Sequence, residues 1–183
     1  YWRVRAENNC RQGEYPDVYA FSTESLSCQS YEANNLPKNI SQSGTPSILA
    51  EIPVSGLGQV ADVNVKLFKG LHERNKDLTA YLQAPDGDRV KLFGNECGNQ
   101  SNINCAVDDE SPSDFSCPLN SQETYKSEVA LGDFNGKDIA GLWILKLDDN
   151  VTGNSGKVEQ ATIEICSNVS LNPPVLVNNN VLE

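Results

Sequence analysis

The sequence predicts an all-β fold. Apolar and polar residues alternate with a period of two in three segments, 62–68, 77–93 and 158–165, which is the pattern of strands that bury one face. Clusters of Gly, Asn, Ser and Pro separate these segments, as expected for turns between strands. We find no stretch with convincing helical spacing of apolar residues, apart from a short helix that is possible at Ala130–Phe134.

The segment Ile139–Cys166 organises the prediction. Trp143 lies in an apolar first half, Asp148 and Asp149 begin an acidic turn, and the second half alternates. We predict a hairpin here, and a tight turn at Pro85–Gly87, where proline fixes φ and glycine accepts a positive φ. The segment Gly94–Lys126 is too long and polar for a simple hairpin, and we expect disulfides to replace a core there. The predicted strands are 49–54, 60–68, 78–84, 89–93, 127–131, 142–147 and 157–165.

Composition narrows the class of protein. The 183 residues suffice for one ordinary domain plus fragments, and 38% hydrophobic residues are enough for a core. A net charge of −11 argues against nucleic acid as a partner, because binding a phosphate backbone requires clustered Lys and Arg. The sequence contains neither a membrane span nor an opening signal peptide, so we expect a mature or excised piece.

Six cysteines without the spacing of a zinc site predict disulfides and an oxidising compartment. Cys10 and Cys28 are close enough in sequence to form a local pair. The other four allow three pairings that the sequence does not rank: Cys97, Cys105, Cys117 and Cys166.

The sequence offers little for catalysis. His72 is the only histidine, and no nucleophile-elbow, zinc-protease or phosphate-loop motif is present. We therefore predict that the chain is not an enzyme. His72 could be a pH-sensitive loop contact, because histidine titrates near neutrality; the alternative is a hydrogen-bonded loop histidine with a structural role.

Three ordered segments resemble a known family. Leu36–Phe93, with LFKGLHERNKDLTAYLQAPDGDRVKLF at its end, then CGNQSNINCAVDDE (97–110) and VALGDFNGKDIAGLWILKLDDN (129–150) resemble the P domain of proprotein convertases. The bacterial branch, appended to secreted proteases, is the more similar. The resemblance implies a jelly-roll β-sandwich over residues 31–167. It also implies a secreted accessory domain whose partner is the catalytic domain of the parent protease or its protein substrate; we expect a monomer.

The two ends resemble other modules. Tyr1–Thr23 is similar to the last two strands of a fibronectin type III domain, so we assign residues 1–30 to such a remnant or linker. The alternative is an N-terminal extension of the jelly roll itself. Residues 168–183 contain Pro173 and Pro174, which a central strand excludes. They resemble the entry to a cadherin-like or immunoglobulin-like module, and we assign them to a linker.

Calcium is the cofactor that the acidic loops favour, because Ca²⁺ binds six to eight oxygens from carboxylates, carbonyls and amides. The alternative is that these loops only solvate the surface. Each of the residues we select also matches an acidic position in the P-domain pattern: Asp62, Asp77, Asp108, Asp109, Asp148 and Asp149.

Two other classes of function remain open. A carbohydrate- or protein-binding module would need an exposed strip of aromatic side chains, for which Tyr81, Trp143 and Tyr125 are the candidates. Trp143 lies in a core-strand pattern, which favours a packed aromatic instead. A structural spacer of a surface adhesin would bind no ligand.

Overall fold

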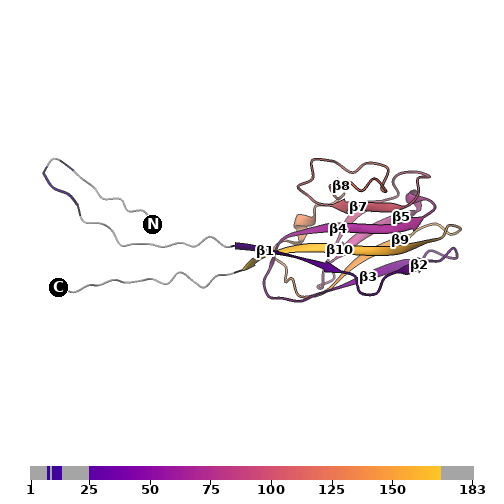
Figure 1. The fold of residues 1–183 in the computed structure, drawn as a ribbon, viewed down its shortest axis with the longest axis horizontal. Helices are drawn as coiled ribbons and strands as arrows, with labels where there is room; N and C mark the ends of the chain where they lie inside the picture. Colours follow the sequence, from indigo (N-terminus) through magenta and orange to yellow (C-terminus); the bar gives the residue numbers. More distant parts are fainter. Residues whose placement is uncertain (1–7, 9, 14–24, 170–183) are drawn as a thin grey trace. The chain divides into compact units, whose positions relative to one another are not determined.

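The computed structural model describes residues 8, 10–13 and 25–169, and Leu26–Asn168 form one compact unit. The fold is a jelly-roll β-sandwich, as predicted, and the described residues contain no α-helix (Figure 1). Two short 3₁₀ helices occur, η1 (Asn75–Asp77) and η2 (Leu131–Phe134). The large sheet contains β1 (Ser25–Glu32), β2 (Lys38–Ile40), β4 (Val60–His72), β7 (Ile103–Val107), β8 (Thr124–Tyr125) and β10 (Gly156–Val169). The small sheet contains β3 (Ser47–Val54), β5 (Leu78–Gln83), β6 (Arg89–Gly94) and β9 (Gly141–Asp149).

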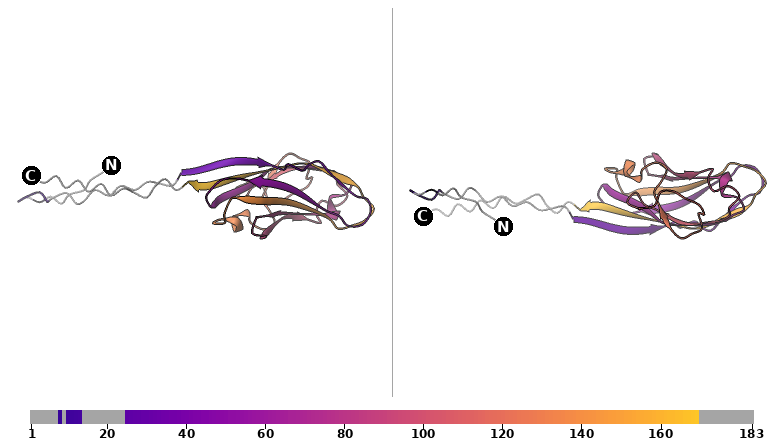
Figure 2. Two further views of the ribbon diagram at one scale, coloured as in Figure 1. Left: turned by 90° about the horizontal axis from the view of Figure 1, so that it is seen from below. Right: turned by 90° about the horizontal axis from the view of Figure 1, so that it is seen from above.

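The two sheets pack face to face (Figure 2). The strand order is β1-β10-β4-β7-β8 in the large sheet, with β2 beside the first part of β10, and β3-β9-β5-β6 in the small sheet. The longest pair is β4 with β10, which are antiparallel from Val60 opposite Ser167 to His72 opposite Gly156. β7 and β8 pair in parallel over two residues.

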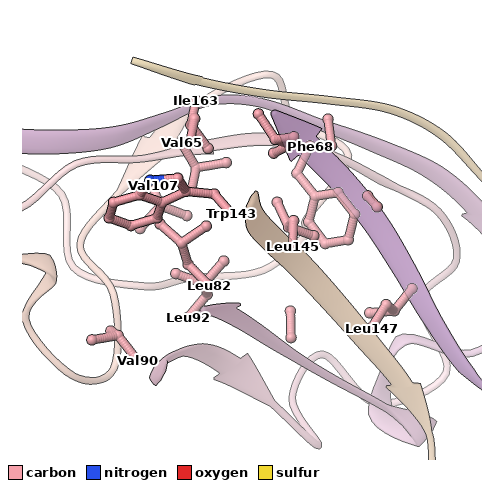
Figure 3. Close-up of a cluster of buried hydrophobic side chains, with 14 of the residues drawn as sticks. Val65, Phe68, Leu82, Val90, Leu92, Val107, Trp143, Leu145, Leu147 and Ile163 are labelled. Atoms are coloured by element: carbon pink, nitrogen blue, oxygen red, sulfur yellow. The ribbon is translucent and has the colours of Figure 1, made fainter. Parts of the chain in front are cut away.

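The core forms where the inward side chains of the two sheets meet (Figure 3). On β9 the inward residues Trp143, Leu145 and Leu147 are buried, whereas Leu142 is exposed, as a period of two requires. Trp143 contacts Phe134 of η2 edge to face and donates a hydrogen bond from Nε1 to the Ile139 carbonyl at 2.9 Å. The indole therefore fills the core without leaving its N–H unpaired.

The hairpin of β5 and β6 confirms one predicted turn. The two strands are antiparallel from Thr79 opposite Gly94 to Gln83 opposite Arg89. Gly87 has φ +96° and donates its N–H to the Ala84 carbonyl, which is the conformation that the Pro85–Gly87 sequence predicts.

The predicted hairpin of Ile139–Cys166 is wrong. Its two strands exist as β9 and β10, but β9 pairs with β3 and β5 while β10 pairs with β4. Residues 150–155 therefore cross from one sheet to the other. The inner faces of both sheets line the same core and show the same alternation, so the pattern locates the strands without assigning their partners.

The predicted strand at 127–131 is also wrong. Glu128 and Val129 donate backbone N–H groups to the carbonyls of Leu92 and Lys91 at the free edge of β6, but the segment does not continue as a strand. It turns instead into η2 (Leu131–Phe134), which confirms the short helical turn predicted near this position.

The segment Gly94–Lys126 contributes to the core, contrary to the expectation that disulfides replace one there. It supplies β7 and β8. Ile103, Leu119 and Tyr125 are buried, and the ring of Phe115 packs between those of Phe93 and Tyr125.

Two disulfides form, Cys28–Cys166 and Cys97–Cys117. The predicted Cys10–Cys28 pair is wrong, because β1 and β10 are neighbours in the large sheet and place Cys28 beside Cys166. None of the three pairings left open for the other cysteines occurs in full. Cys10 is an exposed thiol and Cys105 a buried one.

No helix among the described residues is long and apolar enough to cross a bilayer. The fibronectin-like interpretation of residues 1–23 and the linker at 168–183 lie largely outside the described residues. They stay predictions, as do the domain boundaries.

The two thiols should differ sharply in reactivity. Burial raises the pKa of Cys105 to about 12, so almost no thiolate forms at pH 8, whereas Cys10 is exposed. We expect a thiol reagent to label one cysteine in the native protein and two after unfolding without reductant. Peptide mapping should assign the native label to Cys10. Rapid native labelling of Cys28 or Cys117 would contradict the disulfide pairing.

Candidate functional site

Two groups of polar side chains lie at opposite ends of β4. Asp62 is near its start and His72 at its end, and about ten residues of extended chain span about 33 Å. We call the group around Asp62 the carboxylate cluster, and the group around His72 the buried polar cluster. The carboxylate cluster comprises Asp62, Asn64, Asp108, Asp109 and Glu110; the buried polar cluster comprises His72, Asn75, Asp77, Asp149 and Asn154.

The pairing of β4 with β7 assembles the carboxylate cluster. The two strands are antiparallel, with Val65 opposite Val107. The end of β7 therefore lies beside the start of β4, and Asp108 follows β7 directly. Glu110 stays close because its backbone N–H donates to Asp108 Oδ1 at 2.7 Å.

Burial, a shared hydrogen bond and charge repulsion all raise pKa values in this cluster. Partial burial, then the charge of Asp108, raise the pKa of Asp62. A side-chain hydrogen bond with the Asp108 carboxylate, then slight desolvation and the charge of Asp62, raise the pKa of exposed Glu110. No lysine or arginine contributes to either shift, so the cluster concentrates negative charge that a cation would relieve.

Asn64 lies against this cluster with an unsatisfied oxygen. Its side chain is 6% exposed, and its Nδ2 donates to Asp62 Oδ2 at 2.9 Å. Its Oδ1 is buried and accepts no hydrogen bond from any described residue. A 180° turn of the amide would point this oxygen at the cluster, where a cation could bind it together with Asp62, in exchange for the Asn64–Asp62 hydrogen bond.

Both carboxylate oxygens of Asp109 accept hydrogen bonds that hold a loop in place. Its Oδ1 accepts from the Ser127 hydroxyl at 3.1 Å, and its Oδ2 accepts from the Gly132 N–H at 2.8 Å. Asp109 therefore ties the end of β7 to the start of η2, although its charge also acts on Asp62.

The ligand atoms of the carboxylate cluster are oxygens, which a hard cation prefers, but they are fewer than Ca²⁺ requires. Among the described residues no three His, Cys, Asp or Glu side chains converge closely enough to hold a metal. Asp62 and Asp108 would supply two carboxylates, Asn64 an amide oxygen, and water the remaining oxygens that Ca²⁺ requires.

The buried polar cluster fills the space between the sheets at the other end of β4. The side chains of His72 and Asp149 are each 1% exposed, and His72 Nε2 lies 3.4 Å from Asp149 Oδ2. His72 Nδ1 faces the Arg74 carbonyl at 2.9 Å and the Arg74 N–H at 3.2 Å. The contact with Asp149 is attractive when Nε2 carries a hydrogen, because two bare acceptors would repel.

Amide groups satisfy most of the remaining atoms. Asp77 Oδ2 accepts from Asn154 Nδ2 at 2.7 Å, Asp149 Oδ1 accepts from the Val151 N–H, and Asn75 Nδ2 donates to the Asn102 carbonyl. Three fully buried atoms of this cluster have no hydrogen-bond partner among the described residues: Asn75 Oδ1, His72 Nε2 and Asp149 Oδ2. The histidine is thus a structural member of the fold, at the end of β4 and not in a loop.

The six predicted calcium residues therefore separate into three places. Asp62, Asp108 and Asp109 lie in the carboxylate cluster, and Asp77 and Asp149 lie in the buried polar cluster. Asp148 lies on the outer face of the small sheet, where it pairs with Lys146 at 2.7 Å and accepts from the Ser47 hydroxyl.

The structure offers no catalytic arrangement around His72. Its Nδ1 contacts only the backbone of Arg74, and Nε2 has no hydrogen-bond partner among the described residues. Two of the three candidate aromatics are core residues, because Trp143 and Tyr125 are buried. Tyr81 is partly exposed, but the Arg89 guanidinium lies 4.9 Å from its ring centroid. These aromatics form no exposed strip.

Sequence reasoning missed two members of the carboxylate cluster. Glu110 directly follows Asp108 and Asp109, which we selected, so its place in the sequence could have indicated that it belongs to the same site. Nothing in the sequence indicated Asn64, because a polar residue within a strand is normally expected to face solvent.

The structure thus defines a class: a disulfide-linked jelly-roll sandwich with an acidic cluster and no catalytic triad among its described residues. Residues 60–165, more than half of the chain, match the Proprotein convertase P-domain family. The chain belongs to this family, whose domain is a non-catalytic accessory unit. No curated protein matches the sequence.

Solved structures agree on the fold. A serine protease of Aeromonas sobria aligns with a TM-score of 0.54 and 15% identity over 81% of this chain. The complex of that protease with its chaperone aligns with a TM-score of 0.53 and 16% identity over 80% of this chain. The chain spans 28% of the length of each matched chain.

Asp149 should matter far more to stability than its neighbour Asp148. Asp149→Asn replaces a buried carboxylate oxygen that faces His72 and accepts from the Val151 N–H on its other oxygen, and disturbing such buried polar groups costs about 1 to 3 kcal/mol. Asp148→Asn, the matched control, removes a surface pair and should cost less than about 1 kcal/mol. Urea unfolding measures both, and equal costs would show that the His72–Asp149 contact contributes nothing.

Proposed function

We propose that this P domain is an accessory domain of a secreted multidomain protease. It stabilises the parent enzyme, helps to bind its protein substrate, or does both. Membership of the P-domain family carries this proposal. The two disulfides fit an oxidising, extracellular location, and the partner is the catalytic domain of the parent or its substrate.

Deleting the domain from the parent protein tests this role. Removing residues 26–169 should shorten the half-life of the parent enzyme on heating, or raise KM for a protein substrate while kcat for a short peptide stays unchanged. Asp149→Asn within the intact parent should act in the same direction, because it destabilises the domain alone. A deletion that changes neither inactivation nor substrate binding would remove the accessory role.

We also propose that the carboxylate cluster binds Ca²⁺. The supporting observations are the raised pKa values of Asp62, caused by burial and then by the charge of Asp108, and of Glu110, caused first by its hydrogen bond with Asp108, and the unsatisfied oxygen of buried Asn64. The buried polar cluster is a weaker candidate, because the His72 ring already lies 3.4 Å from Asp149 Oδ2 and Asn154 already donates to Asp77. When bound, calcium would supply charge neutralisation and cross-link β4 to the segment after β7.

Thermal melts with and without calcium test this site. At a hundredfold excess over Kd, a ligand that binds only the native state adds about 2.7 kcal/mol, which raises Tm by several degrees. We expect Asp62→Asn to abolish that shift. In EGTA the same variant should melt slightly higher than the wild type, because burial and Asp108 disfavour the charge of Asp62 in the folded state.

Asp148→Asn is the matched control, since it removes one aspartate charge from the outer face of the small sheet. It should keep the full calcium shift. Equal loss of the shift in both variants would place the site elsewhere. No shift in the wild type, with retained metal excluded by elemental analysis, would remove calcium from the function.

A further inference from the structure

The three unpaired atoms of the buried polar cluster come from three elements. His72 Nε2 belongs to β4, Asn75 Oδ1 to η1 and Asp149 Oδ2 to β9. The side chains of His72 and Asp149 are each 1% exposed, so bulk water does not solvate them. β10 begins beside this cluster, with Gly156 opposite His72, and the last described residue, Val169, lies at the other end of that strand. Buried polar atoms are nearly always paired, so three unpaired atoms in one cluster indicate a bound water or ion.

The other polar atoms of these side chains are bonded, which holds the free atoms in place. Asp149 Oδ1 accepts a backbone N–H at 3.1 Å, so Oδ2 is the oxygen that remains free. Asn75 Nδ2 donates to the Asn102 carbonyl at 2.8 Å, and a turned-over amide would set two oxygens against each other, so Oδ1 occupies the free position. The His72 N–H donates to Asn102 Oδ1 at 3.3 Å. Bonds of this kind orient the ligands in metal sites.

The contacts of the His72 ring allow Nε2 to bind a metal. Nδ1 lies 2.9 Å from the Arg74 carbonyl and 3.2 Å from the Arg74 N–H. The carbonyl is the nearer partner, and a bond to it requires Nδ1 to carry the ring hydrogen. Nε2 is then a bare acceptor that faces a second acceptor, Asp149 Oδ2, at 3.4 Å. Two bare acceptors repel, and a cation between them makes both contacts attractive.

The distance between these two atoms suits a tetrahedral metal. Zinc binds histidine nitrogen and carboxylate oxygen at about 2.0 to 2.1 Å, and a tetrahedral angle then sets the two ligand atoms about 3.4 Å apart. His72 Nε2 and Asp149 Oδ2 lie 3.4 Å apart without a hydrogen bond. Imidazole nitrogen is a ligand for zinc and similar transition metals, whereas Ca²⁺ and Mg²⁺ prefer oxygen. The ring that makes this cluster a weak calcium site therefore favours zinc.

We propose that Zn²⁺ binds between the two sheets, to His72 Nε2 on β4 and Asp149 Oδ2 on β9, with Asn75 Oδ1 as a third ligand and water as the fourth. Among the described residues no third His, Cys, Asp or Glu joins this pair, so an amide oxygen and water complete the tetrahedron. Bound zinc cross-links the large sheet to the small sheet. The site goes beyond the proposed accessory role and does not depend on calcium at the carboxylate cluster.

A surface hollow of about 460 Å³ adjoins the site. His72 lines it together with Glu73, Asn102 and Ser155. Metal and water therefore reach the edge of the imidazole without unfolding of the sandwich. We expect zinc to exchange on the native protein, so that EDTA removes it without denaturant.

Zinc titration of the whole chain tests the proposal, in a Cys10→Ser background because an exposed thiol is a competing zinc ligand. Protein stripped with EDTA should retain one zinc per chain after ZnCl₂ and desalting, and a hundredfold excess over Kd should raise Tm by several degrees. His72 is the only histidine, so the ¹⁵N signals of its ring report this site alone. Zinc should move the Nε2 signal while Nδ1 keeps its hydrogen, and CaCl₂ should not move it.

Variants separate ligands from neighbours. His72→Gln and Asp149→Asn each remove a ligand and should raise the zinc Kd about tenfold or more. Asp77→Asn is the matched control, because it changes a buried carboxylate of the same cluster that bonds Asn154 instead, and it should leave the Kd within about twofold. Asp62→Asn should abolish the calcium shift and keep zinc, so the two metal sites fail separately.

Circular dichroism establishes that each variant is folded, and the ring signals of the wild type decide the question even where a variant unfolds. The proposal is overturned if the stripped wild type retains no zinc. It is also overturned if zinc binds and leaves the His72 signals unchanged, or if Asp77→Asn and Asp149→Asn weaken zinc binding equally.

Discussion

The antiparallel pairing of β4 and β10 is the constraint on which the rest of this structure depends. The pair runs almost the full length of the sandwich, with Val60 opposite Ser167 at one end and His72 opposite Gly156 at the other. β10 holds β1 on its far side and β4 holds β7, so the register of β4 and β10 fixes where the Cys28–Cys166 disulfide lies relative to the carboxylate cluster. Because the two strands also line the core through residues such as Val65, Phe68 and Ile163, a one-residue slip would turn their apolar side chains to solvent. The buried apolar face therefore fixes the position of both polar clusters.

Sequence predicted the class of fold because alternation reports directly on burial. The β5–β6 hairpin was also accessible, since the Pro85–Gly87 turn fixes its register locally. Strand partners were not. β9 and β10 are consecutive and both alternate, yet they lie in different sheets, because a sandwich gives the same pattern to both of its inner faces. β1 was missed for a related reason. Residues 26–30 are all exposed, so this edge strand lacks the alternation of apolar and polar residues that predicts a strand. The disulfide Cys28–Cys166, which spans 138 residues, could not be predicted without that strand.

For the candidate sites too, the sequence predicted individual residues but not which of them lie together. Acidic loops could be recognised from composition, and the adjacent Asp108 and Asp109 were chosen with Asp62. Their grouping depends on the pairing of β4 with β7, which the sequence does not specify. Asp148 and Asp149 are neighbours in sequence, but they point to opposite faces of β9, so one pairs with Lys146 at the surface and the other faces His72 in the interior. Likewise, Trp143 was correctly favoured as a core residue, because its strand pattern is a direct record of burial.

The two polar clusters differ in the groups that surround their carboxylates. In the buried polar cluster, His72 Nε2 faces Asp149 and Asn154 donates to Asp77, although Asn75 Oδ1, His72 Nε2 and Asp149 Oδ2 make no hydrogen bond there. In the carboxylate cluster no basic side chain contributes to the shifts of Asp62 and Glu110, and Asn64 keeps a buried oxygen without a partner. Burial and neighbouring carboxylates disfavour the charged form of Asp62, so the carboxylate cluster costs stability unless a cation binds there. The proposed calcium site would make the stability of the domain depend on the calcium concentration around it.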